Sequence, residues 1–380
     1  MGAAALWGLA VQQARTTSVT AELCKRVRSR KSACTRCLEI CPDDAISLSP
    51  GPTVSAACSD CGLCQSACPT EVFRDELHSE QYLLDRATSI LGTERSPNEQ
   101  ERLLISCHRA GARDAHSLDV PCLGAITENI IVGAALSGFD RIHLMKGNCS
   151  QCRLETGETL FHHSLRRAQA LLDSLGLGDV PVSLEEIEAQ RESTVDRQEL
   201  FSKIASRIRN HAASVRYRRD EAKTEESSGQ AEERATRYSP RRALFRKLAY
   251  PEGSMSFTIK RNEPEFRWGK VSIDEAECSA CGICVTVCPT GALEQGVVNG
   301  CRVLSIVTSG CTKCALCIEA CPEEAIDYDR QWSLADLLDD DQRVVARIQL
   351  TTCFACGEVM PASQGQMCPT CEKREAWRCM

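Results

Sequence analysis

Apolar residues in the middle of the chain follow two different periodicities. Residues 103–106 form a short apolar run, and residues 141–145 alternate between apolar and polar positions as a strand does. Residues 127–136 and 158–175 instead repeat their apolar positions at helical spacing. Short strands separated by helices predict a small α/β domain over residues 100–180, which we call the middle domain.

The pattern changes after this domain. Apolar residues keep a helical spacing only to about Val215, and residues 218–237 are highly charged with almost no large apolar side chains. Such a segment cannot bury enough apolar surface to fold by itself. We therefore expect a helical, charged linker over residues 181–265.

The start of the chain, residues 1–23, has one brief apolar stretch at residues 3–11, without a basic leader or a clear cleavage site. No run reaches the roughly 20 apolar residues that a membrane-spanning helix needs. Apolar content is ordinary at 43 %, but aromatic content is only 4 %, which suits small domains built around inorganic cores. These features predict a cytoplasmic protein without a membrane span.

The chain contains 26 cysteines, most of them in spaced runs. Cysteine is this frequent in disulfide scaffolds, but those are short and secreted, whereas this chain has 380 residues and no visible secretory signal. Four segments share a Cys-Pro step followed, two residues later, by a small and an apolar residue. They begin at Cys41, Cys68, Cys288 and Cys321. Because proline fixes φ and lacks an N–H, each step turns the chain sharply. The repeat predicts two related modules, residues 24–76 (module I) and residues 266–330 (module II).

Module II contains two complete cysteine runs. They read Cys278-x2-Cys281-x2-Cys284-x3-Cys288-Pro289 and Cys311-x2-Cys314-x2-Cys317-x3-Cys321-Pro322. This spacing is similar to that of bacterial two-cluster ferredoxins, in which three cysteines of one run share a 4Fe–4S cluster with the fourth cysteine of the other. The resemblance implies two such clusters. Their ligands are Cys278, Cys281, Cys284 and Cys321 (the Cys278 site), and Cys311, Cys314, Cys317 and Cys288 (the Cys311 site). Gly282 allows backbone N–H groups to turn toward sulfur without a Cβ clash. Two zinc ions are the alternative, but zinc favours separate CxxC pairs.

Module I repeats this pattern with one departure. Its second run is complete, and with Cys41 it predicts a further 4Fe–4S cluster; the ligands are Cys58, Cys61, Cys64 and Cys41 (the Cys58 site). Its first run has Lys31 where a leading cysteine is expected. The other site therefore keeps three cysteines in register, with Cys24 seven residues upstream of the expected position as a candidate fourth. These residues are Cys34, Cys37, Cys68 and Cys24 (the Cys34 site).

Three outcomes are open for the Cys34 site. Cys24 folds back as the fourth ligand of a 4Fe–4S cluster, three thiolates hold a 3Fe–4S cluster, or the site is vestigial. We favour Cys24 as a ligand over the three-iron cluster. The competing interpretation of Cys24 is an ordinary buried thiol on a short helix.

The middle domain has its own group of cysteines. Cys107 ends a strand-like run, and Cys149 follows another; Cys122 and Cys152 complete the set (the Cys107 site). Parallel strands that end at one edge of a sheet would bring these residues together, where α/β folds usually place their sites.

Two segments of this domain resemble a known family. Val120-Pro-Cys-Leu-Gly, then a helix, then Gly138-Phe-Asp-Arg-Ile-His-Leu-Met-Lys-Gly-Asn-Cys, is similar to the delta-subunit family of methyl-viologen-reducing hydrogenases over about residues 103–176. The resemblance implies a 2Fe–2S cluster and a partner that is a hydrogenase, formate dehydrogenase or heterodisulfide reductase-like protein. This chain departs from the family by having Ala110 in place of a second early cysteine and by the close spacing of its late pair. A zinc site or redox-active thiols are the alternatives.

The last segment, residues 350–380, predicts a zinc-ribbon-like tail. It carries two short cysteine pairs, at Cys353 and Cys356 and at Cys368 and Cys371 (the Cys353 site). Paired knuckles at short separation are typical of structural zinc, and a ribbon of this size draws most of its folding free energy from the metal. A single iron, as in rubredoxins, is the alternative on the same sulfur atoms.

Together these features predict an α+β multidomain protein with two ferredoxin-like modules, an α/β domain between them and a zinc-ribbon-like tail. The formal net charge of −7 becomes more negative when thiolate-bound clusters are added, which argues against nucleic acid as a partner. We find no glycine-rich phosphate loop. The first hypothesis is a non-catalytic electron-transfer subunit of an oxidoreductase complex. The others are a catalyst with an incompletely ligated cluster, and a non-redox interaction protein with structural clusters.

Overall fold

A computed structural model describes the chain over six ranges, which are residues 17–76, 78–91, 101–111, 117–187, 266–329 and 341–378. Most of the predicted N-terminal segment and linker lies outside these ranges, as does Cys379.

The middle domain is built on a parallel sheet of strand order β6-β5-β7-β8. Its elements, in chain order, are α5 (Glu80–Leu91), β5 (Arg102–Cys107), β6 (Ser117–Val120), η2 (Leu123–Ala125), α6 (Glu128–Leu136), β7 (Arg141–Lys146), η3 (Cys149–Gln151), α7 (Gly157–Ser174) and β8 (Val182–Glu186). The two strands and two helices that the apolar pattern predicts are confirmed. The sheet continues beyond the predicted domain boundary, because β8 lies in the range assigned to the linker.

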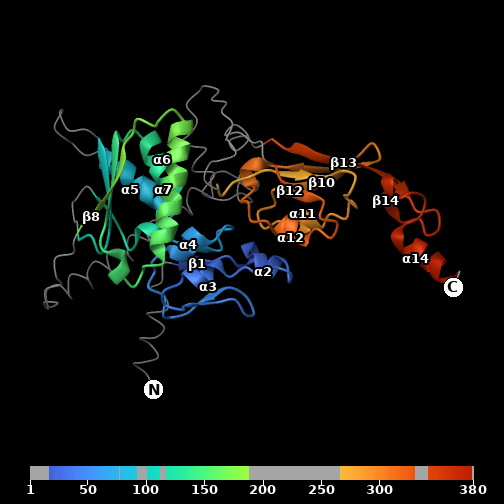
Figure 1. The fold of residues 1–380 in the computed structure, drawn as a ribbon, viewed down its shortest axis with the longest axis horizontal. Coiled ribbons are helices and arrows are strands. Elements are labelled where there is room, and N and C mark those ends of the chain that lie inside the picture. Colours follow the sequence, from blue (N-terminus) through green and yellow to red (C-terminus); the bar gives the residue numbers. More distant parts are fainter. Residues whose placement is uncertain are drawn as a thin grey trace, which may run out of the picture.

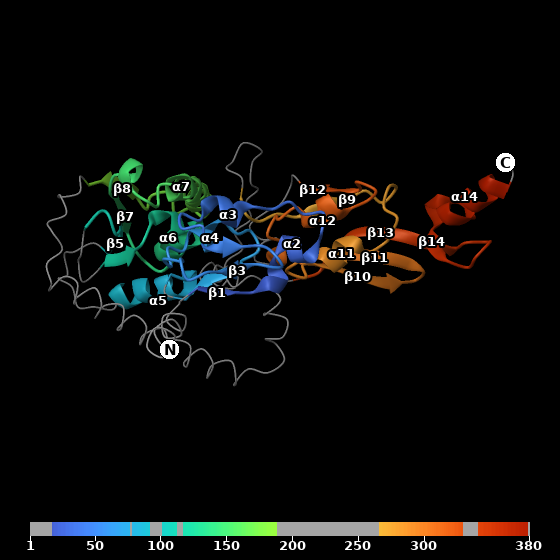
Figure 2. The same cartoon turned by 90° about the horizontal axis from the view of Figure 1, so that it is seen from below.

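The helices lie on one side of this sheet, between it and the rest of the molecule (Figures 1 and 2). Helix α6 is apolar on almost all sides and is buried, as the fully covered Ile130 and Ile131 show. Helix α5 precedes the predicted domain but joins its core through Leu83, Ala87 and Ile90. Its buried Glu80 accepts hydrogen bonds from the side chains of Thr127 and Asn129 at the start of α6.

Modules I and II are built from short helices between small antiparallel sheets. Module I comprises β1 (Thr17–Val19), η1 (Ala21–Leu23), α2 (Lys25–Arg28), α3 (Arg36–Ile40), β2 (Ile46–Ser47), β3 (Thr53–Val54), α4 (Leu63–Ala67) and β4 (Phe73–Asp75). Module II comprises β9 (Val271–Ile273), α11 (Ile283–Val287), β10 (Leu293–Val298), β11 (Cys301–Ile306), η4 (Thr308–Gly310), α12 (Leu316–Ala320) and β12 (Ile326–Tyr328). In each module the first and last strands pair with one another, β1 with β4 and β9 with β12.

The four Cys-Pro turns have the same backbone shape. The third residue after each of these cysteines has a positive φ, between 47° and 66°. These residues are Asp44, Glu71, Gly291 and Glu324. The repeat seen in the sequence is therefore a repeat of backbone conformation in both modules.

The tail is joined to module II by one long strand. Strand β13 (Arg343–Thr352) pairs with β11 along its first part and with β14 (Val359–Pro361) at its end. The tail is completed by η5 (Ala362–Gln364) and α14 (Pro369–Arg378), which lie at the far end of the molecule (Figure 1). The sheet of module II therefore extends into the segment predicted as a separate tail.

A short strap before β9 joins module II to the middle domain. Phe266 and Trp268 are buried in the core of the middle domain, with their rings stacked 6.1 Å apart. Between them, Arg267 forms an ion pair with Glu128 at 3.6 Å and donates a hydrogen bond to the Ser66 carbonyl of module I. The strap thus contacts both neighbouring parts of the chain before it enters module II.

Candidate metal centres

The two candidate sites of module II each gather cysteines from both runs. The four cysteines of the Cys278 site line a single cavity. Burial raises the pKa of Cys284 to about 11, and repulsion from the other three thiols of this site adds to the shift. Burial also raises the pKa of Cys317, and repulsion from the other three thiols of the Cys311 site again contributes. The Cys284 thiol of the other site also raises the pKa of Cys317, so the two sites are neighbours.

A left-handed turn follows the second cysteine of the first run in module II. Gly282 lies between Cys281 and helix α11 with φ of 75°, in the left-handed region that glycine adopts freely. A Cβ at this position would lie 2.6 Å from the side chain of Gln295. Both the backbone conformation and the limited space therefore favour glycine at this position.

Module I gathers its cysteines in the same two groups. Burial raises the pKa of Cys64, and repulsion from the thiols of Cys61, Cys58 and Cys41 raises it further. The four cysteines of the Cys58 site therefore lie close together. Burial raises the pKa of Cys37 to about 12, with further repulsion from the other three thiols of the Cys34 site. Cys24 is among these three. It is buried, and it lies in one apolar cluster with Cys37 and Cys68.

Backbone N–H groups point at the sulfur atoms of module I. Ala45 N lies 3.3 Å from Cys41 Sγ, and Val72 N lies 3.4 Å from Cys68 Sγ. Asp60 N lies 3.4 Å from Cys58 Sγ. Such donors stabilise negative charge on sulfur, so they favour thiolates over thiols.

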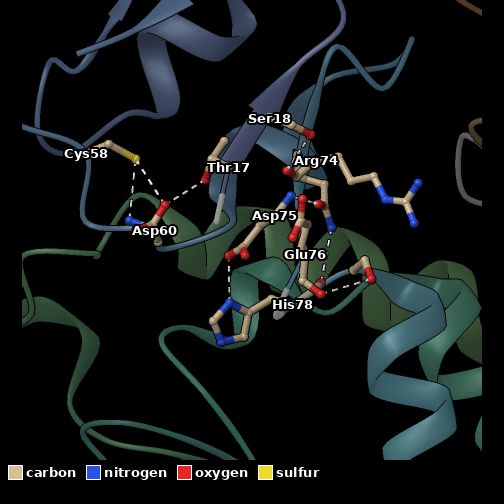
Figure 3. Close-up of polar contacts among 10 residues, drawn as sticks. Thr17, Ser18, Cys58, Asp60, Arg74, Asp75, Glu76 and His78 are labelled. Carbon is tan, nitrogen blue, oxygen red and sulfur yellow. Dashed lines mark hydrogen bonds and ion pairs between the residues drawn. The ribbon is translucent and has the colours of Figure 1, made fainter. Parts of the chain in front are cut away.

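The loop that carries Cys58 is fixed by the first strand (Figure 3). Thr17 in β1 donates a hydrogen bond to the Asp60 carboxylate at 2.9 Å, and the Cys58 thiol lies 3.8 Å from the same carboxylate. Nearby, the buried Asp75 in β4 contacts His78 Nδ1 at 2.6 Å. The Thr17–Asp60 contact holds β1, which is paired with β4, beside the Cys58 loop.

The four cysteines of the middle domain meet at the carboxyl ends of the parallel strands. Cys107 ends β5, while Cys122 and Cys149 follow β6 and β7. All four line one cavity. Burial raises the pKa of Cys122 to about 12, and the other three thiols of the Cys107 site add to it. The N–H groups of Gly147 and Gly124 lie 3.4 Å from Cys107 Sγ and 3.3 Å from Cys122 Sγ.

Charged and polar groups surround the Cys107 site. Lys146 contacts Glu158 at 2.7 Å and Glu186 at 3.2 Å, and its pKa is raised mainly by the hydrogen bond to Glu158. Burial raises the pKa of Cys149 to about 11 and Glu158 adds to this, whereas Lys146 opposes it. His108 is held by its Nδ1, 2.5 Å from the Pro121 carbonyl.

The Cys353 site differs from the others in its compactness. Its four sulfur atoms all lie within 4.8 Å of one another, and it is the one group of potential metal ligands found this close together in the described ranges. Cys368 N donates a hydrogen bond to Cys353 Sγ at 3.2 Å, which is the main reason that the pKa of Cys353 is lowered to about 6. Cys371, which faces the neighbouring sulfur atoms, has its pKa raised to about 12.

Gathered thiols of this kind fit metal-bound centres. Each thiol opposes ionisation of its neighbours, and in the five cluster-like sites burial opposes it too. Iron ions at the centre would supply the positive charge that removes this conflict, and the N–H groups aimed at sulfur would complete the stabilisation. The donor sets are all-sulfur, which suits iron–sulfur clusters and zinc.

Several charged residues near these sites have no obvious signature in the sequence. Arg267 and Glu128 are far apart in the chain, and so are Lys25 and Glu319, which lie 2.7 Å apart. Their pairing depends on how the modules pack, which cysteine spacing does not encode. Cys301, outside the runs, starts β11 and donates a hydrogen bond to Gln349 at 3.0 Å.

Comparison with protein families adds two matches. The model described as "4Fe-4S binding domain" matches residues 271–294 and 304–327, which contain both cysteine runs of module II. The model described as "Methyl-viologen-reducing hydrogenase, delta subunit" matches residues 107–210. This match contains the whole Cys107 site and extends further toward the C-terminus than the resemblance over residues 103–176.

No curated protein matches the chain. The part of the chain that the structure describes has no helix with the length and apolar character needed to cross a bilayer. The chain therefore combines 4Fe–4S binding motifs, a domain similar to a hydrogenase delta subunit and mixed α and β structure.

Proposed function

We propose that this protein is a multi-cluster iron–sulfur electron-transfer subunit of a larger cytoplasmic oxidoreductase complex. One observation carries the proposal. In both modules and in the middle domain, thiols from separate parts of the chain converge in groups of four. Two of these groups lie in matches to 4Fe–4S motifs, and a third lies in the match to the hydrogenase delta subunit.

We assign a cofactor to each group. Modules I and II would hold four 4Fe–4S clusters, at the Cys58, Cys34, Cys311 and Cys278 sites. For the Cys34 site, the packing of the buried Cys24 in one cluster with Cys37 and Cys68 supports Cys24 as the fourth ligand rather than a three-iron cluster. The Cys107 site would hold a 2Fe–2S cluster, and the Cys353 site would hold zinc.

These clusters supply reversible one-electron chemistry. The chain's own residues shield and tune them. Buried positions such as Cys37 and Cys284 exclude water, while N–H groups such as those of Val72 and Gly147 stabilise the negative charge on sulfur. The cysteines require a reducing environment to remain thiols, which agrees with a cytoplasmic location.

The proposed partner follows from the middle domain. Its match to a hydrogenase delta subunit supports assembly with a hydrogenase-type complex. A formate dehydrogenase or a heterodisulfide reductase-like protein is the wider class that the sequence resemblance implies. The Cys107 site, at an edge of the sheet, is the proposed port where electrons enter or leave.

Metal analysis tests the proposal directly. The full chain is purified without oxygen from a host able to assemble clusters, and its iron, sulfide and zinc are measured together with the EPR spectrum after reduction. We expect about 18 irons, from four cubanes and one 2Fe–2S cluster, together with about one zinc. A colourless preparation, or about eight irons with several zincs, would contradict the proposal.

A second measurement separates electron transfer from catalysis. We expect the reduced protein to pass electrons to a one-electron acceptor, and to show no steady turnover of a small disulfide in the absence of a partner. Sustained disulfide turnover by the isolated protein would instead favour the catalytic hypothesis.

A further inference from the structure

Helix α2 lies between Cys24 and the incomplete first run of module I. The first run has Lys31 at the expected leading position, and Cys24, ten residues before Cys34, joins the site instead. The chain between these two cysteines therefore contains an additional helix, Lys25–Arg28. Both views show this helix facing α11 and α12 of module II (Figures 1 and 2).

Lys25 connects the two modules by charge. Its backbone follows Cys24 directly, so it belongs to the Cys34 site of module I. Its side chain is only 9 % exposed and contacts Glu319 of α12 at 2.7 Å. Glu319 lies on α12 two residues after Cys317, a residue of the Cys311 site. One residue thus adjoins a candidate site in each module.

Arg28 connects the same two sites through hydrogen bonds. Its backbone N–H donates to the Cys24 carbonyl at 3.0 Å within the helix. Its guanidinium group donates to the Cys288 carbonyl at 3.0 Å and to the Thr286 carbonyl at 2.8 Å. Cys24 is the candidate ligand in module I and Cys288 belongs to the Cys311 site, so one residue is hydrogen-bonded to a cysteine carbonyl of each site.

The other end of module I is packed as closely against the middle domain. Leu63 follows Cys61 in the Cys58 site after one glycine, is fully buried, and shares an apolar cluster with Cys122 of the Cys107 site. A Cβ on Gly157 would lie 2.5 Å from Cys122 Sγ and 2.9 Å from Leu63 Cδ2. Glycine at this position is therefore what allows the two sites to approach each other.

Contacts within each module place its two candidate sites next to each other. Cys64 of the Cys58 site packs on the cluster formed by Cys24, Cys37 and Cys68. In module II, Cys317 of the Cys311 site packs in the same apolar cluster as Cys284 of the Cys278 site. The sites therefore follow one another as the Cys107, Cys58, Cys34, Cys311 and Cys278 sites, and the last includes the exposed Cys281.

We propose that helix α2 is the electron-transfer junction between the two modules, and that Lys25 is a positioning residue that favours the reduced state of the Cys311 site. This inference rests on the proposed function. A redox protein docked at the Cys107 site is the one-electron donor or acceptor. Each step oxidises one centre by one electron and reduces the next by one electron, and no bond or proton changes place.

The role of Lys25 follows from charge. A thiolate-bound cubane carries one more negative charge when it is reduced, so a nearby ammonium group favours the reduced state. Because Lys25 is almost fully buried, water and salt screen it little. Arg26, on the same helix, is exposed and forms no contact of this kind in the described structure, so it provides a matched control of equal charge.

The test is an EPR-monitored redox titration of the full, cluster-loaded chain and of single variants. In Lys25→Gln we expect the equilibrium constant for reducing one cubane to fall about threefold to tenfold, which is a midpoint lower by about 30 to 59 mV for a one-electron couple. Glu319→Gln, which removes the opposing charge, should raise the midpoint of the same cubane. Lys25→Arg should restore it, and Arg26→Gln should leave all midpoints unchanged.

Each result has a defined meaning. Equal shifts in Lys25→Gln and Arg26→Gln, or shifts of the same sign in Lys25→Gln and Glu319→Gln, would overturn the junction while leaving the proposed function intact. A merely structural role for Lys25 would change iron content without opposite shifts of one midpoint, and this also overturns the proposal. Failure of the proposed function itself is visible earlier, because the unmodified protein would then hold no reducible clusters.

Discussion

Modules I and II share a repeat but differ in how one site is completed. In module II both cysteine runs are complete, and each run enters its helix from a residue in the left-handed region, Gly282 with φ of 75° and Ala315 with φ of 67°. In module I the complete run does the same at Gly62, with φ of 74°. The incomplete run enters α3 from Thr35, with φ of −129°.

This difference shows which part of the pattern is local. All four Cys-Pro turns keep their shape in both modules, so they do not depend on the leading cysteine. The turn before the helix changes in the one run that lacks this cysteine. There Cys24, from an upstream segment, approaches the site, and α2 occupies the intervening chain. The run that lacks a cysteine is thus accompanied by a helix whose Lys25 and Arg28 contact module II.

The largest expected effect comes from removing two cysteines from equivalent sites. We predict that Cys281→Ala/Cys284→Ala in module II and Cys34→Ala/Cys37→Ala in module I each lower the iron content by about four, because two remaining thiolates cannot hold a cubane. Iron and sulfide analysis of anaerobically purified protein measures both. A smaller loss from the module I pair would break the comparison, since it would indicate a vestigial Cys34 site.

The control for this experiment is Cys301→Ala. Cys301 lies outside the runs, and its thiol contacts Gln349 rather than another cysteine. Iron content should therefore remain at about 18.

The next largest effect concerns how module II is attached. Glu128 is almost fully buried and pairs with Arg167 at 3.1 Å and with Arg267 of the strap at 3.6 Å. Replacing Glu128 with Gln removes the carboxylate that pairs with the buried Arg167 guanidinium and with Arg267 of the strap, so we predict a loss of about 3–5 kcal/mol of unfolding free energy. Denaturant unfolding followed by tryptophan fluorescence measures it, with the exposed Glu185→Gln as control.

The pH dependence of this loss has a defined sign. Burial raises the pKa of Glu128, but Arg267 and Arg167 together lower it below the usual value of 4.5. A carboxyl whose pKa is depressed in the folded state contributes stability above the unfolded pKa and loses it as the pH falls through the folded pKa. The difference between the unmodified protein and Glu128→Gln should therefore be constant from about pH 8 to pH 5.5. A difference that shrinks in this range would contradict the ionised pair.

Sequence reasoning reached the features that depend on neighbours in the chain. The periodicity of residues 127–136 identified α6, and the alternation of residues 141–145 identified β7. It did not reach β8 or the continuity of β13 with the tail, because short strands take their stability from pairing partners far away in sequence. The Lys25–Glu319 contact was beyond its reach for the same reason.

A smaller effect tests the substitute ligand. We predict that Cys24→Ser lowers the iron content by about one, from about 18 to about 17, and produces the oxidised EPR signal of a three-iron centre. The reason is that three thiolates remain in register at the Cys34 site. Adding Lys31→Cys to this variant places a cysteine at the regular position and should restore the lost iron. If Cys24→Ser retained all its iron, Cys24 would be an ordinary buried thiol.

The smallest predicted effect separates backbone conformation from ligand identity. Ala315 occupies the left-handed position that Gly62 and Gly282 occupy in the other complete runs, and a Cβ in this conformation costs roughly 1–2 kcal/mol. Ala315→Gly should therefore raise the unfolding free energy by about 1 kcal/mol, whereas Gly282→Ala should lower it by at least as much, because the added Cβ also meets Gln295. Iron content should stay constant in both variants.

The equivalent change at Thr35, to Gly, should instead destabilise module I slightly, because Thr35 does not adopt the left-handed conformation and glycine adds freedom only to the unfolded chain. Stabilisation by Thr35→Gly equal to that by Ala315→Gly would mean that the two helix entries are alike, and the distinction between the complete and incomplete runs would be lost.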